Sequence, residues 1–268
     1  MSNLYLSPRI IIEDIKAVWQ YRALILNFAI NELKSRYRNT VLGFFWSLIE
    51  PLAWFGVLYA IFTVIIQVRT EDYALYMFMG LLMYHGFSKG TVQGMHSIVS
   101  KSGIVSRISL PMEITVVATT LSSFISILLD FSIFLVFMVA FQFIPPWSIV
   151  LLPALLGLEM ILILAVSLPL SVLSVFYKDL EYAWHVVLQI GFWTSPITFR
   201  YDLFTPIERT ILGHNPMAGL IELGHTLVLG NDIMQNYFLF YTLIIPFVIL
   251  FWGYAIFKMY VSRVVEEL

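Results

Sequence analysis

The sequence predicts an all-α membrane protein with six transmembrane helices, an N-terminal amphipathic interface helix and two short extracytoplasmic helices. Two compositional observations carry this prediction: 60% of the residues are hydrophobic, and only 12% are charged, against about 25% in soluble domains. A chain of 268 residues has too little interior for so many apolar side chains, so much of its surface must face lipid. A third observation is that the apolar residues fall into helix-length stretches rather than the short alternating segments of a membrane β-barrel.

Composition also excludes several classes of function. A net charge of −2 provides no electrostatic footprint for nucleic acid. The absence of cysteine excludes disulfides, thiolate zinc sites and cysteine nucleophiles. The five histidines show no ligand spacing, so no metal site is expected.

The first forty residues are expected to be cytoplasmic and to form two short helices. Ser7–Pro8 is a plausible cap with proline in the first turn. Further along, an apolar stripe formed by Leu26, Ile30, Leu33 and Tyr37 is backed by a polar face formed by Asn27, Asn31, Lys34 and Arg38. This pattern favours a helix lying in the membrane interface. The alternative is a juxtamembrane stretch whose charges only set topology.

Six apolar stretches have the length or composition of membrane spans, the second of them by extension into the weakly polar segment that follows. They are residues 41–68, 73–87, 114–143, 147–176, 183–199 and 236–257. If the chain crosses the membrane at each stretch, 12 of the 15 lysines and arginines lie in segments on one side of the membrane, and three lie on the other. The positive-inside rule then puts both termini in the cytoplasm. Residues 41–260 are thus expected to form the transmembrane domain, followed by a short tail at 261–268.

Two connecting segments carry further information. The cytoplasmic connection at 88–110 mixes serines and lysines with small apolar residues, which is typical either of a short helix that docks a partner or of an ordinary loop. On the other side, Thr205-Pro206-Ile207-Glu208 is a capping box with proline at the first helical position, and Asn215-Pro216 starts a second helix. These two helices could form a gate or a structural hairpin.

Two acids lie near the middle of their expected spans. Asp130 and Glu159 could belong to a proton or ion relay, but without an obvious basic partner a hydrogen-bonded packing contact or a protonated acid is favoured. The chain has no G-x-x-x-x-G-K-[ST] sequence and so no P-loop for ATP. Energy for any transport must therefore come from a partner or an ion gradient.

Aromatic residues form two stripes at helical spacing. One is expected in the first span and the other in the fifth, and they could line a path for sugar rings, whose apolar faces stack on aromatic planes, or could simply be packing contacts. The residues are Phe44, Phe55, Tyr59 and Phe62 in the first stripe and Trp184, Phe192 and Phe199 in the second.

Three sequence blocks together resemble the permease subunits of type-2 ABC exporters for polysaccharides. The first is an R-Y-x-x-T-x-L-G-x-x-W stretch followed by proline, and the others include Ser195-Pro196-Ile197 and Asn215-Pro216-Met217. In this chain the first block reads Arg36, Tyr37, Thr40, Leu42, Gly43, Trp46 and Pro51, and the second begins at Val175-Phe-Tyr-Lys-Asp-Leu180 and continues at Leu188-Gln189.

The resemblance implies a homodimer that pairs with two copies of a separate ATPase subunit, which would hold ATP and Mg. It implies no cofactor and no catalytic residue in this chain, and a position in a bacterial or archaeal cytoplasmic membrane. The substrate would be an undecaprenyl-linked polysaccharide, with O-antigen closest and capsule or teichoic acid exported by the same architecture.

The resemblance also assigns roles. Spans one and five would line the channel, and the short helices around Thr205, Pro206, Asn215 and Pro216 would form the gate. The basic cluster Lys34, Arg36 and Arg38 is our hypothesis for a pyrophosphate contact. The expected coupling helix, which would touch the ATPase, comprises Met95, His96, Ser97, Ile98, Val99, Ser100, Lys101 and Ser102.

Two other classes stay open at this point. A polytopic enzyme acting on lipid-linked sugars would need paired catalytic groups at a water-facing end. A proton-coupled carrier would use Asp130 and Glu159.

Overall fold

The computed structural model describes residues 8–38, 45–70, 72–105, 110–200, 203, 205–230 and 239–267. Helices dominate this part of the chain and no strand occurs in it, which agrees with the all-α prediction. The N-terminal half contains α1 (Pro8–Gln20), α2 (Arg22–Tyr37), α3 (Phe45–Ala60) with a π-helical turn η1 (Ile61–Ile65), α4 (Tyr73–Met95), α5 (Ser97–Ser100), α6 (Ser102–Val105) and α7 (Met112–Ala140). The C-terminal half contains η2 (Trp147–Leu151), α8 (Leu152–Phe176), α9 (Leu180–Trp193), α10 (Pro206–Gly213), α11 (Pro216–Leu229) and α12 (Leu239–Glu267).

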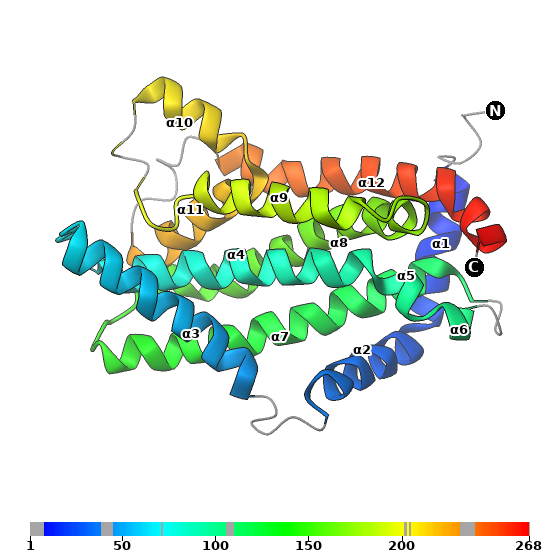
Figure 1. Ribbon diagram of the computed structural model, residues 1–268, viewed down its shortest axis with the longest axis horizontal. Helices are drawn as coiled ribbons and strands as arrows, with labels where there is room; N and C mark the ends of the chain where they lie inside the picture. Colours follow the sequence, from blue (N-terminus) through cyan, green and yellow to red (C-terminus); the bar gives the residue numbers. More distant parts are fainter. Residues whose placement is uncertain are drawn as a thin grey trace.

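Four described helical segments are long and apolar enough to cross a membrane. They correspond to the first, third, fourth and sixth expected spans, and the helices α4, α7, α8, α9 and α12 run along the long axis of the molecule (Figure 1). The segments are Phe45–Ile65, Met112–Ala140, Trp147–Phe176 and Leu239–Val264. The chain is therefore a multi-pass membrane protein.

The second and fifth expected spans are not among these long apolar helices. Helix α4 has 23 residues, about 34 Å at 1.5 Å per residue, but most of its side chains are buried between neighbouring helices. A helix covered by protein does not need a fully apolar surface. Helix α9 has 14 residues, about 21 Å, so the helical part of the fifth expected span is shorter than the hydrocarbon core of about 30 Å.

Helices α4 and α8 approach each other closely along a ladder of small residues. Three glycines on one face of α4, spaced by four residues, meet three residues of α8 with the same spacing. Gly90 meets Ile163 and Gly94 meets Ser167, whereas a β-carbon at Gly86 would lie 2.7 Å from Ile127 of α7 and 3.1 Å from Glu159. Small residues at such intervals let helix backbones pack closely in membranes.

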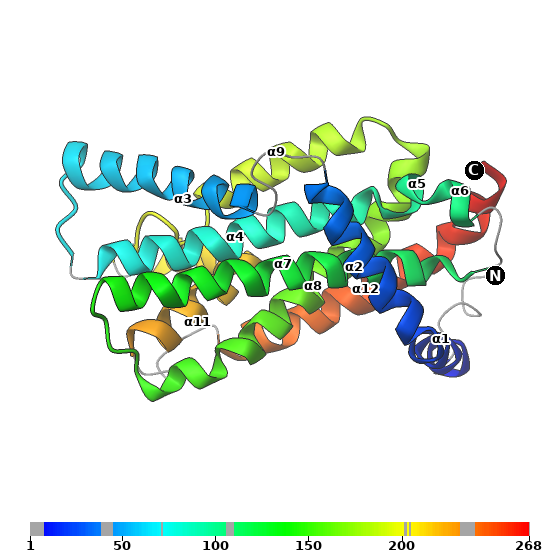
Figure 2. The same cartoon turned by 90° about the horizontal axis from the view of Figure 1, so that it is seen from below.

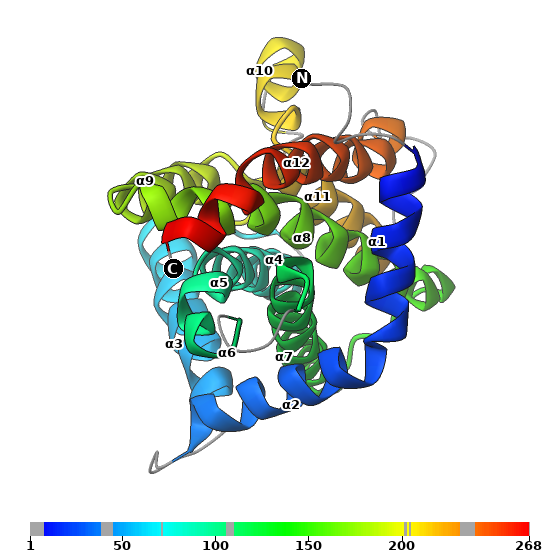
Figure 3. The same cartoon turned by 90° about the vertical axis from the view of Figure 1, so that its right-hand side faces the viewer.

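The described ends of the chain gather at one end of the bundle. Helices α1 and α2 lie across that end, and α5, α6 and the end of α12 lie there too (Figures 1 and 3). Helix α12 continues without a break through residues 261–267, where a separate tail is expected. The opposite end carries α10.

Helix α2 packs on α7 through a different face from the predicted stripe. Ile25 is buried against Ile114 and Ala118 of α7, and Ala29 on the same face is fully buried, whereas Leu26 is exposed. The contacting face is displaced by one residue because α7, rather than lipid alone, covers the helix. The polar face with Asn27, Asn31, Lys34 and Arg38 is exposed, as predicted.

The helix starts at Thr205 and Asn215 are confirmed. Thr205 accepts a hydrogen bond from the backbone N–H of Glu208, whose carboxylate accepts one from the Thr205 N–H at 2.8 Å. The Asn215 side chain accepts from the Met217 N–H at 3.1 Å, and α11 ends at Gly230 in the left-handed conformation with φ of 81°. Helix α11 is largely buried, whereas α10 is exposed.

Candidate functional site

A cleft of about 500 Å³ lies between α3 and α9, with α4 as its floor. Figure 2 shows α3 and α9 on the same side of α4. The indoles of Trp54 and Trp193, on α3 and α9, are both more than half exposed at this cleft. The other residues that line it are Leu81, Tyr84, His85, Ser88, His185, Leu188, Gln189 and Phe192. Exposed aromatic faces beside imidazole, hydroxyl and amide groups are the combination that a sugar ring requires, since its C–H faces are apolar and its rim is polar.

One end of the cleft is charged. Glu50 of α3 accepts a hydrogen bond from the ammonium of Lys89 on α4 at 3.1 Å, and His85 Nε2 lies 3.7 Å from the same carboxylate. Glu50 lies in the second turn of α3, His85 near the middle of α4, and Lys89 closer to the end of α4 that leads to α5. The Glu50 side chain is about half exposed here.

Helix α9 is fixed on α4 by two specific contacts. The Tyr84 hydroxyl donates to the Leu188 carbonyl, and it occupies a notch at Gly191, where a β-carbon would lie 2.5 Å from the hydroxyl oxygen. The Trp184 indole N–H donates to Thr91 Oγ1 at 3.1 Å. These contacts set the width of the cleft.

The predicted aromatic stripe of α3 packs inside the bundle. Phe55 is 9% exposed, and its ring lies 4.9 Å from that of Phe78 and 5.3 Å from that of Phe137. Tyr59 and Phe62 pack against the same core, whereas Phe44 lies outside the described residues. A channel role for this stripe stays a prediction.

Of the three aromatic residues predicted for the fifth span, only Phe192 lines the cleft. Phe192 lines the cleft and meets Tyr84 edge to face at 5.5 Å. Trp184 is half-buried on Thr91 and is not among the residues that line the cleft. The Phe199 carbonyl accepts a hydrogen bond from the Tyr76 hydroxyl at 3.0 Å, beyond the end of the helix.

Trp54, Trp193 and His185 were not among the residues predicted for the site, and Gln189 was named only as part of the second sequence block. Trp54 follows Glu50 by four residues and so shares its face. Because Glu50 requires water, this spacing could have identified the open face of α3.

The basic cluster on α2 is partly neutralised. Arg36 Nη2 lies 2.7 Å from Glu32 Oε1, whereas Lys34 and Arg38 are exposed. Burial acts to raise the pKa of the Glu32 carboxyl, but the Lys101 ammonium and the Arg36 guanidinium outweigh it, so the pKa lies below its ordinary value. Lys34 and Arg38 therefore present the cations that face outward.

The expected coupling residues fall into an anchored set and an exposed set. Met95, Ser97 and Ile98 are buried, with Ile98 in a cluster that includes Val116 and Phe257. Val99 and Ser100 are exposed. His96 Nε2 lies 3.4 Å from Glu181 of α9, and Ser102 is partly buried at the start of α6.

Asp130 and Glu159 lie deep in the bundle. Glu159 is fully buried, and neither of its carboxylate oxygens has a hydrogen-bond partner among the described residues. Asp130 is 7% exposed, and its Oδ1 likewise has no partner there.

A second, larger cavity of about 750 Å³ lies between α1, α7, α8 and α12. Its walls include Val117, Leu164, Leu168 and Leu250, and its acidic residues Asp14 and Glu113 both pair with Lys258. An apolar cavity of this kind offers little to a sugar, so the cleft between α3 and α9 is the better candidate.

Comparisons with known proteins agree with the sequence resemblance. No family model matches the chain. An O-antigen export system permease protein RfbA of Myxococcus xanthus is 26% identical over 211 residues, which cover 77% of this chain and 80% of the relative. A protein of the same name from Klebsiella pneumoniae is 25% identical over 240 residues, 88% of this chain and 92% of the relative. The polysialic acid transport protein KpsM of Escherichia coli is 22% identical over 232 residues, 85% of this chain and 90% of the relative.

These relatives are similar to the chain across most of its length, so the likeness is not confined to one motif. It includes the blocks around Arg36, Val175 and Asn215 as well as the helices between them. The resemblance to permease subunits of type-2 ABC exporters for polysaccharides is therefore confirmed, and the chain is a homologue of these proteins.

Proposed function

We propose that this chain is the membrane permease of an ATP-driven exporter that moves an undecaprenyl-linked polysaccharide, of the O-antigen type, from the cytoplasm across the inner membrane. The observation that carries the proposal is the cleft between α3 and α9, with its exposed indoles and polar rim. The names of the relatives support it.

The proposal uses six membrane spans. Helix α4 crosses as a protein-covered helix, and α9 crosses together with residues 194–199, which are turns packed on α4. Ser195 and Thr198 are buried there, and the Tyr73 hydroxyl donates to the Thr198 carbonyl at 2.7 Å. Irregular backbone is tolerated at membrane depth where protein covers it. Both termini then lie in the cytoplasm with the cation-rich segments.

A homodimer would complete the path. Next to the cleft, α3 and α9 expose Val57, Val186 and Ile190. A second copy placed on these apolar faces would enclose the indoles of Trp54 and Trp193 between protomers. The channel would then be lined by the open faces of both helices.

The chain works without binding ATP itself. Two ATPase subunits that hold ATP and Mg would contact Val99 and Ser100, the exposed residues of the coupling segment. Ile98 would carry the push into the bundle, because it is fully buried among side chains of α7, α8 and α12. The shift would then reach α3 and α9.

Substrate would enter from the cytoplasmic leaflet beside α2. The exposed cations of Lys34 and Arg38 would hold the lipid pyrophosphate, since charge-assisted hydrogen bonds to phosphate are strong. Arg36 would join them on release from Glu32. If Arg36→Ala and Arg38→Ala left export and membrane levels unchanged, this role would be wrong.

At the opposite end, α10 is the better candidate for a moving gate. Its residues Ile207 and Ile211 are exposed, whereas α11 is held in the bundle through Gly219 against Thr242 and Gly224 against Met79.

The proposal is tested in a strain that lacks the gene. Undecaprenyl-linked polysaccharide should accumulate in the cytoplasmic leaflet, and the wild-type gene should restore export only with an ATPase partner that can hydrolyse ATP. The composition of the accumulated glycan identifies O-antigen, capsule or teichoic acid. Accumulation of an unmodified lipid-linked sugar, with no need for ATP hydrolysis, would instead support a membrane enzyme. Survival of transport under ATP depletion, together with its loss in Asp130→Asn, would support a proton-coupled carrier.

A further inference from the structure

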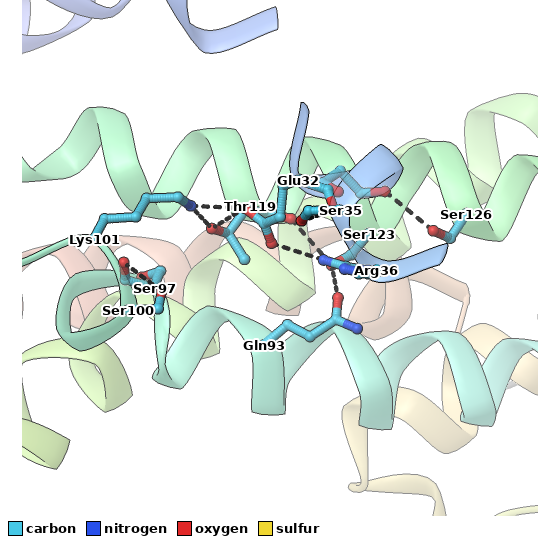
Figure 4. A network of polar contacts seen from close by, with 11 residues as sticks. Glu32, Ser35, Arg36, Gln93, Ser97, Ser100, Lys101, Thr119, Ser123 and Ser126 are labelled. Carbon is cyan, nitrogen blue, oxygen red and sulfur yellow. Dashed lines mark hydrogen bonds and ion pairs between the residues drawn. The ribbon is translucent and has the colours of Figure 1, made fainter. Parts of the chain in front are cut away.

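Three segments that are distant in sequence meet at the carboxylate of Glu32 on α2. The Lys101 ammonium, which lies between α5 and α6, donates to Glu32 Oε2 at 2.7 Å. The Thr119 hydroxyl of α7 donates to the same oxygen at 3.0 Å. The other oxygen, Oε1, binds Arg36 Nη2 at 2.7 Å, so that both oxygens are engaged (Figure 4).

The contact is largely buried, and further hydrogen bonds support it. Side chains of Glu32 and Lys101 are 19% and 14% exposed, and Thr119 is buried. Lys101 also donates to the Thr119 hydroxyl, which closes a triangle of three hydrogen bonds. On the next turn of α7, the Ser123 hydroxyl donates to Gln93 of α4 at 2.6 Å. A charge-assisted network in such a setting holds its members in one geometry.

Lys101 directly follows the exposed residues Val99 and Ser100, so any displacement of those residues moves it. Glu32 lies between the part of α2 that is anchored on α7, at Ile25, and its cationic end at Lys34 and Arg38. A force applied to the carboxylate therefore acts on the end of α2 that carries the cations.

We propose that Glu32 is a positioning residue that links the coupling segment, residues 95–102, to α2, so that movement imposed by the ATPase at Val99 and Ser100 shifts the cationic end of α2. The proposal rests on the proposed function for the identity of the partner that moves the segment. Movement of the coupling segment would then be transmitted in two ways, through Ile98 into the bundle and through Glu32 to the proposed substrate entrance at α2.

The test is a double-mutant cycle with Glu32→Gln, Lys101→Met and the double variant, in the permease–ATPase complex reconstituted in lipid nanodiscs. Lys101→Arg keeps the charge and should rescue, and Lys16→Met removes an exposed cation from α1 as the matched control. Every variant is first checked for membrane level and for assembly with the ATPase. Since the chain has no cysteine, Asn31→Cys on α2 and Leu128→Cys on α7 provide clean positions for spin labels, and both native residues are exposed.

Two readouts are taken. Trapping the ATPase with ATP should change the label distance in the wild type, Lys16→Met and Lys101→Arg, but not in Lys101→Met. Glycan-stimulated ATP hydrolysis and export should fall roughly tenfold in Lys101→Met and Glu32→Gln but not in Lys16→Met. The double variant should be no worse than the more severe single variant.

A label distance that still changes in Lys101→Met, or losses that multiply in the double variant, would overturn the inference. So would a wild-type label distance that does not respond to ATP, whatever the complex exports. If ATP changes the label distance in the wild type but no polysaccharide stimulates ATP hydrolysis, the link through Glu32 is supported and the proposed function is contradicted.

Discussion

Gly94 of α4 lies so close to Ser167 of α8 that a β-carbon at Gly94 would be 2.0 Å from the serine Oγ and 2.4 Å from its β-carbon. No rotamer change of Ser167 relieves the second contact, because the β-carbon position is fixed by the backbone. The two helices therefore meet here by backbone approach, and the position of α4 relative to α8 depends on the absence of a side chain.

Gly94→Ala should destabilise the protein by about 1–3 kcal/mol, the range typical of overpacking. Gly157→Ala is the matched control on α8, since nothing lies within 4 Å of a β-carbon there, and alanine in an open helical position is neutral or stabilising by up to about 1 kcal/mol. Thermal unfolding in detergent measures both. Equal midpoints for the two variants would show that α4 and α8 are not packed at this distance.

Trp184→Phe should lower stability by roughly 1 kcal/mol, because the ring stays but the hydrogen bond from its indole N–H to the buried Thr91 hydroxyl is lost. Transport per folded molecule should be unchanged. The measurement is export normalised to the folded fraction, together with the unfolding midpoint. If the variant had normal stability but lost export, the prediction that Trp184 lines the channel would be supported instead.

Trp54→Ala and Trp193→Ala should each raise the glycan concentration that half-saturates ATP hydrolysis, by about three- to tenfold if an indole stacks on a sugar as aromatic pairs do. Trp147→Ala, at the start of η2, is the control, since this tryptophan is 79% exposed and lies outside the cleft. Unfolding midpoints should not move, because both cleft indoles are more than half exposed. A loss of the same size in the control would indicate a general effect of removing membrane-facing tryptophans.

Local signals in the sequence were sufficient for the helix caps. Thr205 and Asn215 cap α10 and α11 through atoms within three residues of themselves, so no tertiary information is needed to predict them. The fourth span, 147–176, was also predicted with its observed bounds, because Pro146 precedes it and Tyr177 ends its apolar run.

Tertiary contacts decided the features that the sequence analysis missed. The Phe55 and Trp54 faces of α3 are both aromatic, so helical periodicity cannot indicate which of them packs on α4. The partner of Glu32 lies 69 residues away, which no local pattern reveals. The early end of α9 did have a signal, because Pro196 disfavours a helical conformation in the residue before it.

The ion pair of Glu32 should make stability depend on pH in one direction. Since its folded-state pKa is lowered by Lys101 and Arg36 despite burial, the pair stabilises the protein above the ordinary carboxyl value, about 4.3. This stabilisation is lost as the pH falls through the lower folded-state value. The wild type should therefore unfold at a higher temperature than Glu32→Gln at pH 7, and the difference should shrink toward pH 3.

Lys101→Met removes the same pair from the other side, so its difference from the wild type should shrink over the same pH range. A difference that stays constant from pH 7 to pH 3, for either variant, would mean that the charge of Glu32 does not contribute.

Thr205→Ala and Asn215→Ala remove equivalent N-caps from helices in different surroundings, which makes them a matched pair for the gate. Loss of such a cap costs about 0.5–2 kcal/mol of helix stability. In the buried α11 this cost should appear as a lower global unfolding midpoint, because the helix unfolds only with the bundle. In the exposed α10 it should appear as local fraying, with faster amide hydrogen exchange over residues 206–213 and an unchanged midpoint. Export should then fall in Thr205→Ala at normal stability if α10 closes the path, and a Thr205→Ala protein with frayed α10 but full export would remove the gate role from this helix.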